Sequence, residues 1–229
     1  GGLMLELRDV NASIGNIPIL RNLTFSIDEA ETVALIGRNG AGKTTLLRTI
    51  MGFTKASGEI LFDGKPITEL HPPKRPGLGI GYAPEDRRLF SAFTVEENIL
   101  LPAQAARLSA AETAKRLERA YTVLPELREM AGRPGGTVSG GQGKMVALAR
   151  ALMLGTKLIM LDEPFQGLAP ALAQRYAEAL RTLRDTDRSV TLIITESNPS
   201  LLRGFADRTL VIERGEVEEG SLEPEGTNA

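Results

Sequence analysis

The chain has 229 residues, of which 42% are hydrophobic and 24% are charged, a balance typical of a globular domain. The 27 basic and 29 acidic residues give a net charge of −2, which argues against a nucleic-acid binder that relies on bulk positive charge. Without cysteine there is no disulfide, thiolate metal site or cysteine nucleophile, and one histidine, His71, argues against a multi-histidine metal site or a Ser-His-Asp triad. No apolar run approaches the roughly 18 residues of a membrane span, and the first residues are too polar for a signal peptide, so we expect a cytoplasmic protein.

The first seventy residues predict strands around one helix. LMLELRDV and LRNLTFSI alternate weakly between apolar and polar residues, with the turn residue Asn16 between them, which predicts antiparallel strands. ETVALIG predicts a buried strand that ends at Gly37, and KTTLLRTIMGF predicts a helix that stops near Gly52. SGEILFDGKPI predicts a hairpin, since Asp63 and Gly64 lie between apolar positions.

The middle of the chain predicts a loop, a short strand and then helices. Residues 71–84 are rich in proline and glycine, with GIGYA as the strand. Residues 94–135 are expected to be helical, because Thr94 with Glu97 and Ser109 with Glu112 match capping boxes before apolar residues at helical spacing.

The last third predicts alternating helices and strands. A helix runs from Ser139, LIMLD is a buried strand, and Leu172, Tyr176 and Leu180 mark one face of a further helix. SVTLIIT and RTLVIERGEV predict strands, and the acidic tail after Glu216 is expected to fray. Buried strands that alternate with helices predict a mostly parallel sheet covered on both faces.

The segment GRNGAGKTT, residues 37–45, matches the phosphate-binding pattern G-x-x-x-x-G-K-[ST] between a predicted strand and a predicted helix. Its glycines let backbone N–H groups turn onto phosphate oxygens, and the helix N-terminus adds its positive end. Lys43 supplies a charge for the β- and γ-phosphates, and Thr44 is a candidate Mg²⁺ ligand. A chance glycine-rich turn is the alternative. The expected nucleotide contacts here are Gly37, Asn39, Gly40, Ala41, Gly42, Lys43, Thr44 and Thr45.

Two acids follow the apolar strand LIML. At the end of such a strand Asp162 would serve Mg²⁺, directly or through water, and Glu163 would reach an attacking water. Phosphoryl transfer needs positioning, charge neutralisation and one group that orients the nucleophile. The alternative is an Asp-Glu pair that only caps a strand-to-loop turn.

The segment SGGQ begins a predicted helix after a break at PGG. A serine hydroxyl and two glycines at a helix N-terminus form a second surface for phosphate. One chain would hardly place two such surfaces on one γ-phosphate, so a second subunit is implied; an ordinary N-cap is the alternative. The residues concerned are Ser139, Gly140, Gly141 and Gln142.

Together, GRNGAGKTT, VSGGQ roughly a hundred residues later and LIMLDEP about twenty further on resemble the ATP-binding subunit of an ABC transporter, over nearly the whole chain. GIGYAPEDRRLFSAFTVEENI, FQGLAP and TESN resemble the branched-chain amino-acid and urea uptake group. The resemblance implies a P-loop NTPase (RecA-like) α/β core with a mostly parallel sheet. A single domain, residues 3–229, would carry an N-terminal antiparallel β subdomain at about 3–35 and 55–70 and a helical subdomain insert at about 86–142.

The resemblance also implies partners and further roles. Two ATP-binding subunits would pair head to tail as a homo- or heterodimer, with each ATP between one phosphate loop and the other subunit's Ser139 surface. ATP and Mg²⁺ would drive a transmembrane permease from the inner face of the cell membrane, and no nucleic acid is expected. Glu85 replaces the usual glutamine that senses Mg²⁺, and residues 85–100 would lie near the permease. The basic pairs at 74–75 and 87–88 are expected to be solvated surface rather than a permease contact.

Three positions depart from the family pattern. Ser197 replaces the usual γ-phosphate histidine, and its hydroxyl can hydrogen-bond phosphate without carrying imidazolium charge. Ile14 stands where an aromatic normally stacks on adenine, which predicts weak base specificity. Gly143 lies inside the SGGQ helix, where glycine costs roughly 1 kcal/mol relative to alanine.

We therefore expect an ATPase subunit that energises uptake of branched-chain amino acids or a related small polar solute. An ABC-type ATPase that acts as a scaffold or regulator without transport is the main alternative, and a P-loop nucleotide kinase is a weaker one. ABC-type translation or repair ATPases usually carry two cassettes or a long insert, and this chain has neither.

Overall fold

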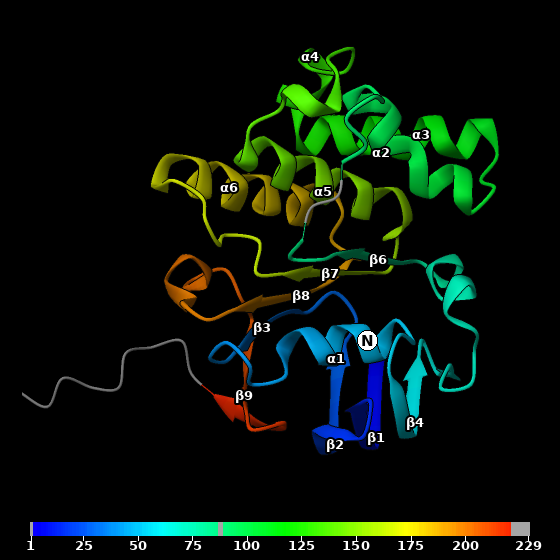
Figure 1. The fold of residues 1–229 in the computed structure, drawn as a ribbon, viewed down its shortest axis with the longest axis vertical. Coiled ribbons are helices and arrows are strands. Elements are labelled where there is room, and N and C mark those ends of the chain that lie inside the picture. Colours follow the sequence, from blue (N-terminus) through cyan, green and yellow to red (C-terminus); the bar gives the residue numbers. More distant parts are fainter. Residues whose placement is uncertain (1, 87–88, 221–229) are drawn as a thin grey trace, which may run out of the picture. The chain divides into compact units, whose positions relative to one another are not determined.

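The computed structural model describes residues 2–86 and 89–220 (Figure 1). The chain divides into two compact units, residues 1–75 with 191–229 and residues 76–190. Unit 1 contains β1 (Leu3–Ile14), β2 (Ile17–Asp28), β3 (Thr32–Ile36), α1 (Lys43–Ile50), β4 (Lys55–Phe62), β5 (Lys65–Pro66), β8 (Thr191–Glu196), β9 (Arg208–Glu213) and β10 (Glu216–Gly220). Unit 2 contains β6 (Ile80–Ala83), α2 (Val95–Ala105), α3 (Ala110–Val123), α4 (Pro125–Glu129), α5 (Gly140–Leu154), β7 (Leu158–Asp162) and α6 (Pro170–Thr186).

The N-terminal strands of unit 1 form the predicted antiparallel sheet, in the order β2-β1-β4-β5. The turn between β4 and β5 places Asp63 at φ 50° and Gly64 at φ 79°. Two successive left-handed residues match the right-handed twist of the flanking strands, which is why Asp-Gly forms this hairpin. The hairpin predicted around these two residues is confirmed.

The second sheet of unit 1 is built on β3, which pairs in parallel with β8 and with β9. Every residue of β8 is buried, and β3 is buried apart from a half-buried Ile36, as expected for strands covered on both faces. The expected fraying after Glu216 is wrong for residues 217–220, which belong to β10 and pair antiparallel with β9. The ion pair of Arg208 with Glu219, 2.5 Å, joins the two strands; the rest of the tail lies outside the described residues.

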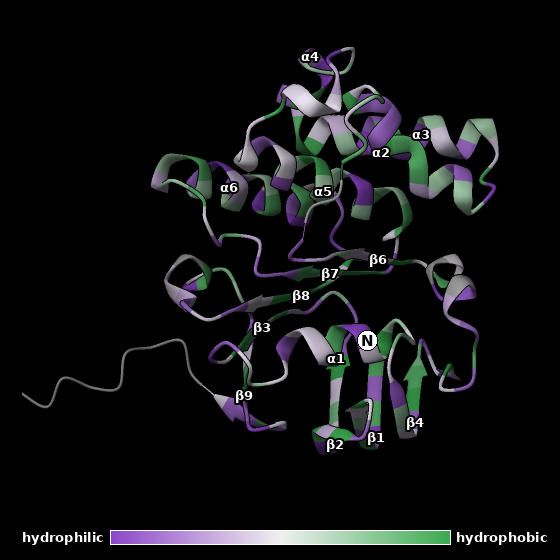
Figure 2. Ribbon diagram, in the orientation of Figure 1, coloured by the Kyte–Doolittle hydropathy of each residue, from purple (hydrophilic) through white to green (hydrophobic). Residues whose placement is uncertain are grey.

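Unit 2 contains the parallel pair β6–β7 and the predicted helices. The strand β7 is uniformly hydrophobic up to its final acid, whereas α3 and α6 alternate between hydrophobic and hydrophilic residues (Figure 2). The predicted capping box at Thr94 and Glu97 is confirmed. Ser109 makes only its half of the second box, because the Glu112 carboxylate accepts from Arg116 Nε at 2.9 Å instead.

The described residues contain no helix that is both long and apolar enough to cross a bilayer.

Candidate functional site

The phosphate-binding motif of unit 1 is the loop between β3 and α1. Gly40 and Gly42 have φ values of 83° and 115°, which side chains other than glycine rarely adopt. A Cβ at Gly37 would lie 2.6 Å from the carbonyl oxygen of Ile212, so the neighbouring β9 leaves no room for one. The motif therefore needs its glycines for backbone conformation at two positions and for close packing at a third.

Hydrogen bonds close this loop on itself and onto unit 1. The Lys43 ammonium donates to the Gly37 carbonyl, and the Ala41 amide donates to the Arg38 carbonyl at 3.0 Å. The Gly215 amide donates to the Ala41 carbonyl at 3.1 Å, which ties the loop to the β9–β10 turn. Lys43 is buried and Thr44 is exposed at the first turn of α1, so a charge and a hydroxyl stand at the helix end that favours anions.

Ser197 lies at the same sheet edge as this loop. It follows β8 directly and is exposed. The adjacent residue, Glu196, is paired in register with Ile36, and its carbonyl accepts from the Gly37 amide at 3.2 Å. The structure thus brings together the phosphate-binding motif and the position at which the sequence departs from the family histidine.

The proposed adenine contact, Ile14, lies at the turn between β1 and β2. Its side chain is 55% exposed, and Ile17 across the turn is 66% exposed. Sequence reasoning missed Ile17, although two large aliphatic residues flanking Gly15 and Asn16 in a turn were a visible signal. The turn presents an aliphatic surface in place of an aromatic ring.

Unit 2 carries the acids. Asp162 ends β7 and Glu163 follows it at φ 48°; both are buried. The buried Lys144 of α5 donates its ammonium to the Glu163 carbonyl at 2.9 Å, which fixes the backbone just after the strand. Sequence reasoning missed Lys144, the second residue after SGGQ.

Glu85 lies within electrostatic reach of both acids. Its pKa is raised, first by desolvation and then by repulsion from Asp162 and Glu163, while Lys144 opposes the shift. The neighbouring carboxylates raise the cost of ionising Glu85, the most exposed of the three.

Among the described residues no group of three or more histidine, cysteine, aspartate or glutamate side chains has the geometry to hold a metal ion. Mg²⁺ in phosphate sites takes one or two protein ligands, with the remaining positions filled by water and phosphate oxygens. Thr44, Glu85 and Asp162 each carry the hard oxygen atoms that Mg²⁺ prefers, so these residue types fit the ion.

Ser139 is the N-cap of α5 in a complete capping box. Its hydroxyl accepts from the Gln142 amide at 3.1 Å, and the Gln142 side chain accepts from the Ser139 amide at 2.9 Å. A Cβ at Gly141 would lie 1.9 Å from Cδ2 of Leu172 in α6, so a side chain there would have to displace the end of that leucine. Ser139 and Gly140 are exposed, and the N–H groups of the first turn start a 15-residue helix.

Known proteins resemble this chain in sequence. Residues 20–166 match the family model described as ABC transporter. The high-affinity branched-chain amino acid transport ATP-binding protein BraG of Pseudomonas aeruginosa is 36% identical over 93% of this chain and 91% of its own length. The probable branched-chain amino acid transport ATP-binding protein LivF of Archaeoglobus fulgidus is 35% identical over 93% and 90%. The methionine import ATP-binding protein MetN of Rhizobium johnstonii is also 36% identical, over 96% of this chain and 61% of its own length.

Solved structures resemble it in fold. The ADP conformation of an ATP-binding cassette of an ABC transporter has a TM-score of 0.81 and 28% identity, and covers 96% of this chain and 92% of that chain. A nucleotide-free ATP-binding cassette from an ABC transporter has the same TM-score at 26% identity, with the same shares covered. The predicted fold class, a P-loop α/β core with an antiparallel N-terminal sheet, is confirmed.

Proposed function

The chain belongs to the ABC transporter family as an ATP-binding subunit that hydrolyses ATP to energise transport, and from this premise we propose that it serves the uptake of branched-chain amino acids or a related small polar solute. The choice of solute is supported by the share of each relative's own length that this chain matches. BraG and LivF match this chain over at least 90% of their own lengths, whereas MetN matches over 61%.

We propose the following roles for the site residues in ATP hydrolysis. Lys43 and the amides of residues 39–45 hold the phosphates, and Glu163 polarises the attacking water. Mg²⁺, when bound through Thr44 and Asp162, neutralises charge on the phosphates. Glu85 lies near Asp162, so its raised pKa fits a carboxylate that meets the ion directly or through water.

We propose that two ATP-binding subunits pair head to tail, with Ser139, Gly140, Gly141 and Gln142 of one facing the nucleotide of the other. The exposed N-terminus of α5 supports this, since its amides and helix dipole suit a phosphate. Ser197 provides only a neutral hydroxyl for the γ-phosphate, so a partner that keeps a histidine there would complete a more active site.

Subunits of this family work with transmembrane permeases, and we propose residues 85–100 as the docking segment. Phe90 and Phe93 are 54% and 40% exposed, with ring centroids 5.5 Å apart. The fully buried Asn98 holds this pair in place, because its side chain accepts from the Phe90 amide at 2.8 Å and donates to the Phe90 carbonyl at 3.0 Å. Rigidly held, exposed aromatic rings are typical of an interface.

The test is ATP hydrolysis by the purified chain over a range of protein concentrations, with and without Mg²⁺. We expect Mg²⁺-dependent hydrolysis whose rate per subunit rises with concentration, and loss of activity in Lys43→Ala. ATP binding with no hydrolysis at any concentration would point to a different, histidine-bearing partner. Absence of ATP binding would refute the proposal.

A scaffold or regulator without transport is the alternative that the motifs leave open. Co-purification separates the two: a transporter subunit is recovered with a membrane permease, and Phe90→Ser with Phe93→Ser should abolish that recovery while ATP binding persists. A purely soluble partner would favour the alternative.

A further inference from the structure

Arg75 was expected on the solvated surface, as half of a basic pair, and this expectation is wrong. Its side chain lies in the interior of unit 1, with 3% of the residue exposed. Burial lowers the pKa of the guanidinium, as expected for a charge taken out of water. A buried arginine requires hydrogen-bond acceptors around it, and its partners indicate what it holds.

Four backbone carbonyls surround the guanidinium. Nη1 donates to the carbonyls of Thr49 and Ile50, at 3.2 and 2.7 Å. Nε donates to Leu70 at 3.0 Å and Nη2 to Thr68 at 3.0 Å. No carboxylate belongs to this set within the part of the chain that the structure describes. Arg75 therefore joins two segments through backbone oxygens alone.

The first of these segments is the C-terminal end of α1. Its final turn leaves carbonyls without partners inside the helix, and the helix dipole makes that end negative, so a cation there is doubly favoured. The N-terminal end of the same helix begins at Lys43, within the phosphate-binding motif. With eight residues, α1 is only about 12 Å long. A shift or tilt at one end is therefore felt at the other.

The second segment is anchored to the antiparallel sheet. The Thr68 hydroxyl accepts from the Ile60 amide of β4 at 2.8 Å, and the Leu70 amide donates to the Ile67 carbonyl at 2.9 Å. Arg75 thus ties α1 to the sheet that also carries Ile14.

Gly52 leaves room for this arrangement. It has φ 85°, and a Cβ there would lie 2.7 Å from Arg75 Nε and 2.8 Å from Cζ. Any side chain at this position would push the guanidinium off the end of α1. The glycine after the helix and the buried arginine form one packing unit.

We propose that Arg75 is a positioning residue for nucleotide binding: by fixing the C-terminal end of α1 against residues 68–70, it holds Lys43 and Thr44 in register with the phosphates. The inference rests on the proposed ATP binding. Arg75 lies outside every nucleotide-binding motif, and the proposal gives it a share of the affinity for the phosphate chain of the nucleotide.

The experiment measures the Kd of Mg-ATP and Mg-ADP calorimetrically for the wild type, Arg75→Met and Arg75→Lys. We expect Arg75→Met to raise both Kd values at least about tenfold, since small misplacements of binding groups are costly. Arg75→Lys keeps the charge and should recover part of the affinity. If Arg75 only stabilised the fold, its substitution would lower the binding stoichiometry and the Tm and leave the Kd of the folded fraction unchanged.

Two glycine variants extend the test without removing the arginine. Gly52→Ala displaces the guanidinium, whereas Gly64→Ala introduces a side chain at a similar φ of 79° with nothing within 4 Å. Both glycines have a positive φ of similar size, so both variants carry backbone strain, and only Gly52→Ala also displaces Arg75. We expect a raised Kd for Gly52→Ala and a wild-type Kd for Gly64→Ala.

The outcomes are distinct. If the wild type binds nucleotide and both Arg75→Met and Gly52→Ala keep its Kd, the positioning role is refuted while the proposed function stands. If Arg75→Met does not fold, the comparison of Gly52→Ala with Gly64→Ala decides. A wild type that binds no nucleotide refutes the positioning role together with the proposed function.

Discussion

Glu163 occupies an unusual backbone conformation for a residue with a side chain. Its φ of 48° lies in the left-handed region, and its carbonyl is held by the Lys144 ammonium. Such strain is retained where surrounding structure enforces it, and it is common at functional sites. The backbone is therefore fixed independently of the carboxylate, which makes the side chain a clean target for substitution.

We predict that Glu163→Gln binds ATP with a Kd within about twofold of the wild type but loses hydrolysis by about a hundredfold or more, because the isosteric amide cannot accept a proton from water. Single-turnover hydrolysis with radiolabelled ATP measures the loss. Glu129→Gln, on the exposed end of α4, is the control and should hydrolyse normally. Turnover close to wild type in Glu163→Gln would contradict its assignment.

The raised pKa of Glu85 predicts that this residue destabilises the folded protein in a pH-dependent way. Its pKa is raised in the folded state, so the native protein binds more protons than the unfolded chain as pH rises through the ordinary carboxyl range. The Glu85 carboxylate does not destabilise the folded protein below the pKa that it has in the unfolded chain. It destabilises the folded protein in full above the pKa that it has in the folded state. Glu85→Gln removes it, and we expect Tm to rise by about 1–2 °C at pH 7.5 with no change near pH 4.

Thermal unfolding at the two pH values tests this effect. The exposed Glu69→Gln changes net charge by the same amount and serves as the control. A gain in Tm for Glu85→Gln that is equal at both pH values, or that Glu69→Gln reproduces, would contradict the electrostatic cause.

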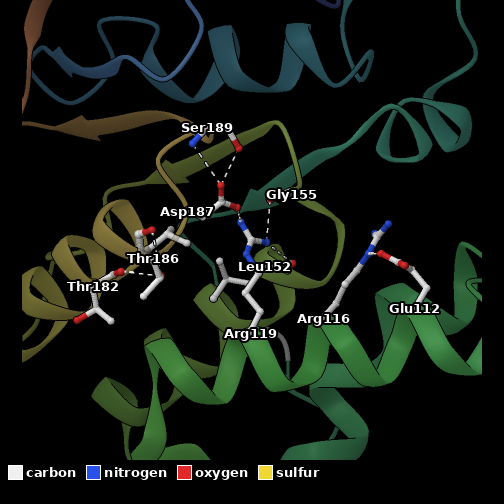
Figure 3. Close-up of polar contacts among 10 residues, drawn as sticks. Glu112, Arg116, Arg119, Leu152, Gly155, Thr182, Thr186, Asp187 and Ser189 are labelled. Atoms are coloured by element: carbon white, nitrogen blue, oxygen red, sulfur yellow. Dashed lines mark hydrogen bonds and ion pairs between the residues drawn. The ribbon is translucent and has the colours of Figure 1, made fainter.

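At the scale of elements, α5 is held at its C-terminal end by two arginines of α3, and Figure 3 shows one of them, Arg119, with its partners Leu152 and Gly155. Arg116 Nη1 donates to the Met153 carbonyl at 2.9 Å, and Arg119 Nη1 donates to the carbonyls of Leu152 and Gly155 at 3.0 and 3.1 Å. Arg119 also pairs with Asp187 at 3.0 Å, just after the end of α6. These contacts fasten together three helices of unit 2.

We predict that Arg119→Met lowers the free energy of unfolding by about 2–3 kcal/mol, because it leaves Asp187 and two helix-end carbonyls short of a donor in a largely buried setting. Urea denaturation measures the change. Arg8→Met removes an exposed arginine, 51% accessible, from its pair with Glu6 and should destabilise the fold much less than Arg119→Met does, because water already solvates that pair. Equal losses in the two variants would contradict a special role for the α5 clamp.

Sequence reasoning succeeded where local chemistry decides the structure. The Asp63 and Gly64 turn, the Thr94 cap and the glycines of the phosphate motif follow from backbone preferences that neighbouring residues cannot override. It failed for Arg75, because a basic residue beside a lysine has no local sign of burial. The acceptors of its guanidinium lie 5 to 26 residues earlier in the chain and exist only in the fold.

The same limit applied to the acids. The order LIMLDEP predicts a strand that ends in two carboxylates; in the structure β7 ends at Asp162, and Glu163 follows it directly. The interaction of Glu85 with both of them depends on the position of residue 85 just beyond β6, the parallel partner of β7. Parallel pairing brings carboxyl ends of distant strands to one edge, which explains why such sites are easier to recognise by motif than by spacing.

At the scale of the whole molecule, a head-to-tail pair makes a quantitative prediction about mixed subunits. Each site would need Lys43 from one subunit and Ser139 from the other, so a dimer of Lys43→Ala subunits and a dimer of Ser139→Arg subunits each have no complete site. A mixed dimer has one, formed by the intact phosphate loop of the second variant and the intact α5 N-terminus of the first. Random mixing in equal amounts puts half of the dimers in the mixed form, so about a quarter of the wild-type rate should return.

ATP hydrolysis before and after mixing the two purified variants measures this recovery. Mixing each variant with an equal amount of Glu163→Gln, Lys43→Ala double-variant subunits gives the control. With Ser139→Arg, the double variant supplies an intact α5 N-terminus and should restore the same quarter of the wild-type rate. With Lys43→Ala, neither subunit has an intact phosphate loop, so no activity should return. A mixture of Lys43→Ala and Ser139→Arg that stays as inactive as its components, from a wild type that hydrolyses ATP alone, would contradict shared sites between copies of this chain, since sites built within one subunit cannot complement each other.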